Sequence, residues 1–246
     1  MNLIQNKRQF ENFINNILPP LLDNEVYFVS LSARSKYLTE YERKFYGLGN
    51  TTMFARTLVR SKNDWPKAMR SLEGDLQTRL TKNGFLFPQK ALVVYVNINP
   101  SDSVTAVLNF ERQMTVEVSQ MVKAQMRGKE ANFLSFKRAD RMLLDSFQTA
   151  TGERTYLDID MDTKDEKYLN AMRDELLGHG VEHYIIETHG GYHFLVKRAT
   201  LNKSGLRLDL LVKELANDSG VEIMFNKNGM VSIPGTLHSG FLVKVL

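Results

Sequence analysis

Three segments in the first 150 residues are apolar throughout or alternate between apolar and polar positions, and each pattern predicts a β-strand. Segments 26–31 (VYFVSL) and 53–59 (MFARTLV) are rich in aromatic and β-branched residues, and 91–98 (ALVVYVNI) is almost entirely apolar. Apolar residues at helical spacing predict helices at about 6–18, 64–82, 103–126 and 130–148. We therefore expect residues 1–150 to form an N-terminal α/β module.

The order of elements changes after Gly152. The predicted elements are strands at 155–161, 181–187 and 192–197, helices at 164–177 and 203–216, and a closing hairpin of 221–225 and 230–233 that turns at 228–229. This β-α-β-β-α-β-β order is typical of a small antiparallel sheet with both helices on one face. The predicted fold class is therefore α+β, and residues 151–246 form a second module whose open sheet face can carry a site.

The composition is that of a globular protein, with 43% apolar and 24% charged residues in a chain of 246. The chain has no cysteine, which excludes disulfides, thiolate zinc sites and cysteine nucleophiles, so we expect no zinc. No run of about 18 apolar residues occurs, and the first residues lack the apolar block of a signal peptide. We expect a cytoplasmic protein, or a viral or mobile-element protein acting in the host cytoplasm, without membrane contact.

Charge is distributed unevenly between the two predicted modules. Residues 1–150 carry 21 lysines and arginines against 14 acidic residues, whereas residues 151–246 carry 11 against 14. A basic half joined to an acidic half indicates that one part holds a polyanion and the other holds cations, although chance unevenness on a solvated surface would look the same.

Candidate chemistry begins with the aspartates of the segment LDIDMD. Strict alternation places Leu157, Ile159 and Met161 on one face of the predicted strand and the aspartates 158, 160 and 162 on the other. Like carboxylates two residues apart repel each other unless a cation lies between them, and an all-oxygen site favours Mg²⁺ or Mn²⁺. An exposed acidic strand end is the alternative. An EF-hand is excluded because its glycine and glutamate positions are occupied by threonine and leucine.

The second candidate element is the segment THGGYHFLV. If Tyr192 and Phe194 pack under the helices, His193 points to the same face as the aspartates. Thr188, Gly190 and Gly191 form a turn whose backbone N–H groups can approach an anion, as in phosphate-binding turns. A histidine beside a phosphate can donate a hydrogen bond or protonate a leaving group, although a single histidine on a strand is more often structural.

A third carboxylate is expected from the segment GVEIMF. Alternation turns Val221, Ile223 and Phe225 inward and places Glu222 on the open face, where it would complete a cage for two metal ions with Asp158 and Asp160. Asp218 is the alternative, but it is more typical of a turn residue before a glycine. We favour Glu222.

These motifs, in this order, resemble the catalytic core of the archaeo-eukaryotic primase superfamily, which includes primase small subunits and primase-polymerases. The residues that carry the resemblance are Asp158 with Asp160, Thr188 to His193, Val221 with Glu222, and the segment SIPGTLHSG, which contains His238 and is similar to a PGSLH segment of archaeal-type small subunits. The resemblance covers mainly residues 150–246. In that family the catalytic sheet has an RRM-like fold, so an RRM-like sheet packed on the N-terminal module is implied here.

The resemblance implies a template-dependent nucleotidyltransferase, a DNA primase or primase-polymerase. Asp158, Asp160 and Glu222 would bind two Mg²⁺ or Mn²⁺ ions, and His193, the Thr188–Gly191 turn and His238 would contact the incoming nucleotide. The implied partners are a single-stranded DNA template and nucleoside triphosphates, and whether a helicase or a primase large subunit also takes part stays open. Basic residues of the first half are candidates to contact template phosphates: Arg34, Lys36, Arg56, Arg60, Lys62, Lys137, Arg138 and Arg141.

Two other functions fit the same residues. One is a non-catalytic nucleic-acid-binding module of replication on the same fold, which would bind DNA without incorporating nucleotides. The other is a metal-dependent phosphoesterase, which would hydrolyse nucleotides without a template. The preference for ribose or deoxyribose, the initiation of primers and the oligomeric state are not determined by the sequence.

Overall fold

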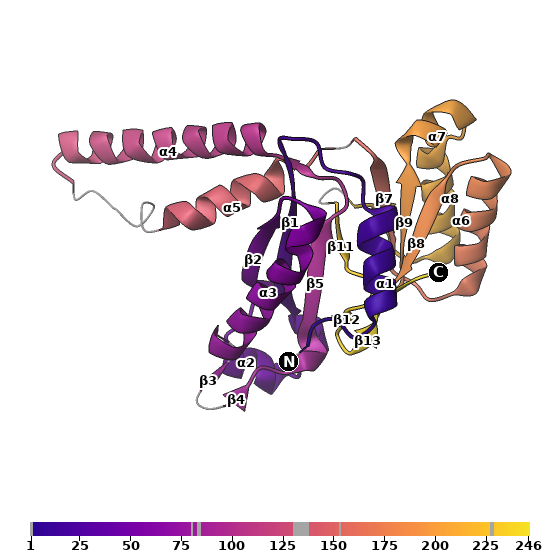
Figure 1. The fold of residues 1–246 in the computed structure, drawn as a ribbon, viewed down its shortest axis with the longest axis horizontal. Helices are drawn as coiled ribbons and strands as arrows, with labels where there is room; N and C mark the ends of the chain where they lie inside the picture. Colours follow the sequence, from indigo (N-terminus) through magenta and orange to yellow (C-terminus); the bar gives the residue numbers. More distant parts are fainter. Residues whose placement is uncertain (1, 80, 83–84, 130–137, 153, 227–228) are drawn as a thin grey trace.

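The computed structural model describes residues 2–79, 81–82, 85–129, 138–152, 154–226 and 229–246. Its two larger sheets, both antiparallel, stand beside each other (Figure 1). The protein is therefore α+β. No helix within the described ranges is both long and apolar enough to cross a membrane.

The first sheet has the order β13-β12-β5-β1-β2, with β11 also paired to β5 and β6 to β1. Its strands are β1 (Glu25–Arg34), β2 (Thr51–Val59), β5 (Leu92–Asn97), β6 (Ser101–Asp102), β11 (Met230–Ser232), β12 (Leu237–His238) and β13 (Phe241–Leu242). The predicted division at residue 150 falls between α5 (Ala139–Thr149) and β7 (Tyr156–Met161). The first sheet nevertheless takes three of its strands from beyond residue 229, so the chain returns to the N-terminal module at its end.

One face of the first sheet is apolar, and the other face is polar only in part. Val29, Leu31 and Ala33 of β1 belong to the large core that also holds Phe10 of α1 (Lys7–Asn12) and Trp65 of α3 (Trp65–Arg79). The residues between them along β1, Ser30, Ser32 and Arg34, point to the opposite face because side chains alternate along a strand. Earlier on the same face of β1, Val26 and Phe28 pack against Ala106 and Phe147 in a smaller core. The polar part of this face therefore lies toward the end of β1, and it faces the second sheet.

The second sheet has the order β10-β7-β9-β8-β14. Its strands are β7 (Tyr156–Met161), β8 (His183–Glu187), β9 (Tyr192–Lys197), β10 (Ile223–Phe225) and β14 (Lys244–Val245). Helices α6 (Glu166–Gly178), α7 (Arg198–Ser204) and α8 (Leu208–Ser219) cover one face. Ile159, Met161 and Phe194 pack there against Met172 and Val212, in a core of their own. The alternation predicted for residues 157–161 is confirmed.

Two predicted elements differ in the structure. The segments expected to form a hairpin around residues 228–229 lie in different sheets, since β10 pairs with β7 and β11 pairs with β5. The turn residues 227–228 lie outside the described residues. The single helix predicted at 203–216 is two helices, because Gly205 adopts a left-handed conformation with φ +70° and ends α7.

The connection between β1 and β2 contains a helix, α2 (Glu40–Tyr46). A capping box starts it: the N–H of Glu42 donates to the Thr39 hydroxyl, and the Glu42 carboxylate accepts from the N–H of Thr39. Helices α4 (Ser103–Met126) and α5 (Ala139–Thr149) extend as a pair away from the first sheet (Figure 1). The remaining elements are short: β3 (Thr81–Lys82), β4 (Phe85–Leu86), single turns at Ser35–Tyr37, Lys62–Asp64 and Gln89–Ala91, and a π-helical turn at Phe13–Ile17.

Candidate functional site

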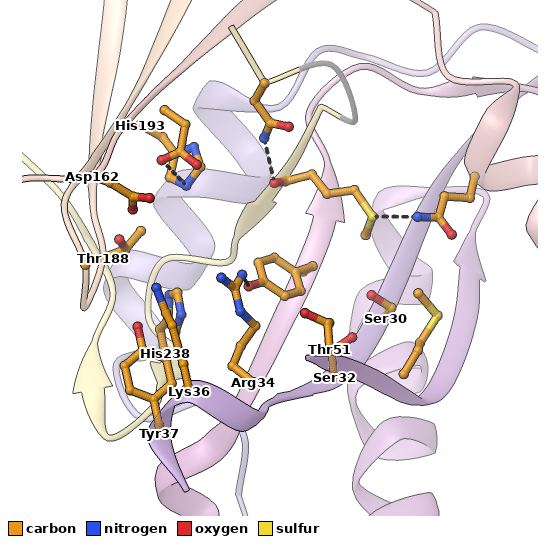
Figure 2. A pocket seen from close by; sticks show the side chains of 17 residues that line it. Ser30, Ser32, Arg34, Lys36, Tyr37, Thr51, Asp162, Thr188, His193 and His238 are labelled. Atoms are coloured by element: carbon orange, nitrogen blue, oxygen red, sulfur yellow. Dashed lines mark hydrogen bonds and ion pairs between the residues drawn. The ribbon is translucent and has the colours of Figure 1, made fainter. Parts of the chain in front are cut away.

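A cavity of about 340 Å³ lies between the polar face of the first sheet and the face of the second sheet that the helices leave free. Both sheets contribute side chains to it, together with the loop after β1, the turn before β9 and helix α5 (Figure 2). The lining residues are Ser30, Ser32, Arg34, Lys36, Tyr37, Thr51, Met53, Tyr95, Gln148, Asp160, Asp162, Thr188, Gly190, His193, Asn226, Met230 and His238. The cavity therefore joins acidic residues of one sheet to basic residues of the other.

The acidic wall comes from β7 and the residue that follows it. Asp160 and Asp162 line the cavity, and the backbone N–H of Asp162 donates to the carbonyl of Glu222 over 3.0 Å. This bond fixes the chain directly after the strand, so Asp162 continues the acidic face that Asp160 begins.

Asp158 occupies a different environment from the other two aspartates. Its side chain is almost completely buried, and Nδ1 of His193 lies 3.1 and 3.2 Å from its two oxygens. The amide Nδ2 of Asn226 also donates to Asp158 Oδ2, at 2.6 Å. Asp158 thus holds His193 and Asn226 in place from behind, while both of those residues reach the cavity.

His193 lies between two aspartates. It is directly opposite Asp160 across the β7–β9 ladder, and its Nε2 is 3.6 Å from Asp160 Oδ1. Burial lowers the pKa of His193, but the negative charges of Asp158, Asp160 and Asp162 outweigh burial and raise it to about 9. Burial also raises the pKa of Asp160, and the like charges of Asp162 and Asp158 add to this increase while His193 opposes it.

The opposite wall is cationic. Arg34 donates from Nη1 to the Tyr95 hydroxyl at 2.8 Å, which aligns its guanidinium along the cavity, and Lys36 follows two residues later. Figure 2 shows Arg34, Lys36 and Tyr37 on the side of the cavity across from Asp162 and His193. One cavity therefore contains carboxylates, which can bind a metal ion, and cationic side chains, which can bind phosphates.

His238 lies beside this cationic wall and stays neutral. Its Nδ1 is 3.0 Å from the Ser232 hydroxyl, whereas its buried Nε2 has no hydrogen-bond partner. Burial, followed by the charges of Arg34 and His193, lowers the pKa of His238 to about 3. A neutral, buried ring nitrogen without a partner in the wall of a cavity is available to a ligand.

The turn before β9 brings the beginning of β9 close to the end of β7. Thr188 donates from its backbone N–H and its hydroxyl to the carbonyl of Gly191, at 2.9 and 3.2 Å. A Cβ on Gly191 would lie 1.9 Å from the carbonyl oxygen of Met161, so only glycine permits this approach. Gly190 and Thr188 line the cavity, and the proposed contact of their backbone with an anion stays a prediction.

The two candidates for a third carboxylate lie elsewhere. Glu222 is exposed, precedes β10 and is not part of the cavity wall. Asp218, near the end of α8, pairs with Lys167 at 2.8 Å on the surface. Within the described part of the chain, no group of three acidic or histidine side chains is arranged to hold a metal ion. Asp162, rather than Glu222, is the further carboxylate that the structure brings beside Asp160.

Of the basic residues that were proposed for a template and that the structure describes, Arg34 and Lys36 line the cavity and the others do not. Arg56 pairs with Asp145, and Lys62 donates to the carbonyl of Asn15 at 3.1 Å. Arg138 and Arg141 lie at the start of α5, and Arg60 is the first residue after β2. Lys137 lies outside the described residues.

Apart from Arg34, sequence reasoning missed the polar residues of β1 and β5 that line the cavity. The signal was present in the segment SLSAR, because Ser30, Ser32 and Arg34 alternate with apolar residues inside a strand that is otherwise buried. Such a pattern predicts a buried polar face, whose side chains need hydrogen-bond partners from another part of the protein, from water or from a ligand. Asn226 carried no comparable signal, since its contact with Asp158 depends on the separation of β10 from β11.

Comparison with known proteins adds nothing to this description, because no family model, curated protein or solved structure matches the chain.

Proposed function

We propose that the protein is a metal-dependent nucleotidyltransferase that joins nucleotides on a nucleic-acid template, as a primase or primase-polymerase does. The observation that carries the proposal is the cavity in which Asp160 and Asp162 face Arg34 and Lys36. A nucleoside triphosphate with its divalent cation needs both signs at short range: carboxylates for the metal and cations for the phosphates.

The donor set fits Mg²⁺ or Mn²⁺. Asp160 and Asp162 offer carboxylate oxygens to the cavity, and like charges and burial raise the pKa of Asp160, a condition that a bound cation would relieve. We assign the metal to these two residues. When bound, the metal would increase the acidity of an attacking 3′-hydroxyl and neutralise the departing pyrophosphate.

Asp158 acts through its neighbours in this proposal. Because both of its oxygens already accept from His193 and one also accepts from Asn226, it orients those two side chains and keeps His193 protonated. A protonated His193 can donate from Nε2 to a phosphate oxygen, and Arg34 and Lys36 can hold the same triphosphate from the other side. Asp158 is thus a positioning residue.

The β7-α6-β8-β9-α7-α8-β10 order of the second module, with helices on one face, supports an RRM-like sheet and the proposed membership of the archaeo-eukaryotic primase superfamily. The partners proposed with it are single-stranded DNA and nucleoside triphosphates.

The test is incorporation of labelled nucleotides on a single-stranded template, with and without a primer, in Mg²⁺ or Mn²⁺. We expect Asp160→Asn combined with Asp162→Asn to abolish product, and Asp174→Asn, a matched change on the exposed face of α6, to leave it unchanged. Equal product from wild type and the double variant would overturn the proposal. Loss of product in Glu222→Gln would instead assign the metal to the residue that the sequence favoured.

Two further outcomes identify the other functions. Nucleotide hydrolysis without a template requirement would indicate a phosphoesterase. Salt-sensitive DNA binding without incorporation would indicate a non-catalytic binding module.

A further inference from the structure

The end of the cavity away from the aspartates is built of hydroxyl groups. Ser30 and Ser32 of β1 and Thr51 of β2 lie together on the polar face of the first sheet, while Asp162, Thr188 and His193 lie at the other end (Figure 2). Pairing of β1 with β2 sets this arrangement, since Thr51 is opposite Arg34, and Met53 is opposite Ser32. We call Ser30, Ser32 and Thr51 the hydroxyl end.

The hydroxyls of this end lack protein partners. The Ser30 side chain is completely buried and its Oγ has no hydrogen-bond partner. Across the residues that the structure describes, the hydroxyls of Ser32 and Thr51 form no hydrogen bond either, although Thr51 retains contact with solvent. A buried hydroxyl without a partner costs about 1–3 kcal/mol, so its presence in a cavity wall indicates a ligand that supplies the missing bond.

The other side chains at this end are uncharged. Met53 and Met230 offer thioether groups that pack well against flat rings, and Gln148 of α5 donates its amide to the sulfur of Met230 at 3.5 Å. Phosphates in proteins are usually bound by arginine, lysine or backbone N–H groups, and among the described lining residues Arg34, Lys36 and the protonated His193 lie away from this end. The hydroxyl end therefore suits an uncharged group with several hydrogen-bonding atoms.

We propose that the hydroxyl end binds the sugar and base of a nucleoside triphosphate, whose phosphates lie between Arg34, Lys36 and the aspartates. The inference rests on the proposed function and adds the orientation of the substrate. A cavity of about 340 Å³ has the volume of a site for one small ligand, and its neutral and charged ends match the two ends of a nucleotide.

The test separates the two ends with two probes. Calorimetry measures binding of a non-hydrolysable nucleoside triphosphate with Mg²⁺, and binding of inorganic tripolyphosphate with Mg²⁺, to wild type, Ser30→Ala, Ser32→Ala and Thr51→Val. Thr52→Val is the matched control, because Thr52 pairs with Ala33 of the core and points to the other face of β2. No template or turnover is needed.

We expect each hydroxyl variant to weaken nucleotide binding about five-fold, the value of one net hydrogen bond, while tripolyphosphate binding stays the same. Thermal unfolding checks the folded state, and Ser30→Ala is expected to melt no lower than wild type because it removes an unpartnered buried hydroxyl. Unchanged nucleotide binding in all three variants, an equal loss of tripolyphosphate binding, or absence of nucleotide binding to the wild type would overturn the inference.

Failure of the proposed function gives a different result. If the hydroxyl variants weaken nucleotide binding but the wild type incorporates no nucleotide, the polymerase proposal fails and the nucleoside site stands. If the wild type incorporates nucleotides and the hydroxyl variants do so with an unchanged KM for nucleotide, the nucleoside site fails and the polymerase proposal stands.

Discussion

Gly191 controls the distance between the strand that carries the aspartates and the strand that carries His193. A Cβ built on Gly191 would lie 1.9 Å from the carbonyl oxygen of Met161, 2.9 Å from its carbonyl carbon and 2.8 Å from the backbone nitrogen of Thr163. All three atoms belong to the backbone, so no side-chain rotation can relieve the overlap. Gly191→Ala must therefore move β9 away from β7 or displace the chain around Asp162.

The expected loss of stability is large for a single methyl group. Overpacking costs about 1–3 kcal/mol when side chains can adjust, and a backbone overlap belongs at or above the upper end of that range. For a chain of this length about 3 kcal/mol corresponds to a decrease of roughly 6–12 °C in the melting temperature. Urea unfolding followed by circular dichroism measures the change. An equal dependence of the unfolding free energy on urea concentration in variant and wild type shows that both expose the same surface on unfolding.

Gly190→Ala is the matched control for this experiment. Its Cβ would lie 3.4 Å from Asp162 Oδ1, which is an ordinary contact, so we expect a change within about 1 kcal/mol. If Gly191→Ala unfolds at the same urea concentration as Gly190→Ala, the close approach of the two strands is not as described.

Three further changes test other parts of the fold. Gly235→Ala should destabilise more than Gly240→Ala in urea unfolding, because both glycines have φ +85° but only Gly235 meets neighbouring atoms, the nearest at 2.4 Å. Tyr156→Phe should cost about 1 kcal/mol by the same measurement, because it removes a 2.7 Å hydrogen bond to the carbonyl of Ile17 that joins the second sheet to the N-terminal segment. His238→Asn should reduce the loss of stability in acid. The pKa of His238 is about 3 in the folded protein and near 6.5 in the unfolded chain, so the unfolded chain binds the proton first as pH falls. Between those values the folded protein therefore loses up to about 1.4 kcal/mol of stability per pH unit.

Each of these expectations has a result that contradicts it. Equal unfolding midpoints for the two glycine variants would place the 2.4 Å contact of Gly235 in doubt. A Tyr156→Phe protein as stable as wild type would show that the hydroxyl contributes nothing to joining the modules. Parallel curves of unfolding free energy against pH for wild type and His238→Asn, from pH 7 to 4, would show that His238 is solvated when folded.

The sequence predicted those helices and strands whose formation depends on residues close to one another in the chain. The strand 192–197 and the helix 103–126 have the bounds of β9 and α4, and the alternation of Leu157, Ile159 and Met161 correctly identified the face of β7 that meets the helices. Side-chain period and helix capping depend on residues a few positions apart. The same reasoning could have found α2, since threonine followed three residues later by glutamate is a capping-box pattern.

Partner choice between strands was not predictable in the same way. A turn signal at 228–229 favoured a hairpin, yet β10 and β11 leave that turn for different sheets. Met230 to Ser232 gain the long apolar strand β5 as a neighbour, and Val231 enters the main core there, fully buried. A hairpin of two three-residue strands offers much less burial, so the tertiary partner decides the pairing. This separation also brings Asn226 to Asp158, a contact that no sequence spacing indicates.

The charge asymmetry along the sequence has a different physical meaning once the two sheets are placed together. The uneven distribution suggested that a basic half holds a polyanion while an acidic half holds metal ions. In the structure the two signs meet in one cavity, with Arg34 and Lys36 of the first half facing Asp160 and Asp162 of the second. Asp160 and Asp162 form the acidic end of the cavity, where burial and the like charges of Asp162 and Asp158 raise the pKa of Asp160 although His193 and Arg34 lower it. A ligand that is anionic throughout would meet repulsion there, whereas a phosphate chain that carries its own divalent cation satisfies both walls at once.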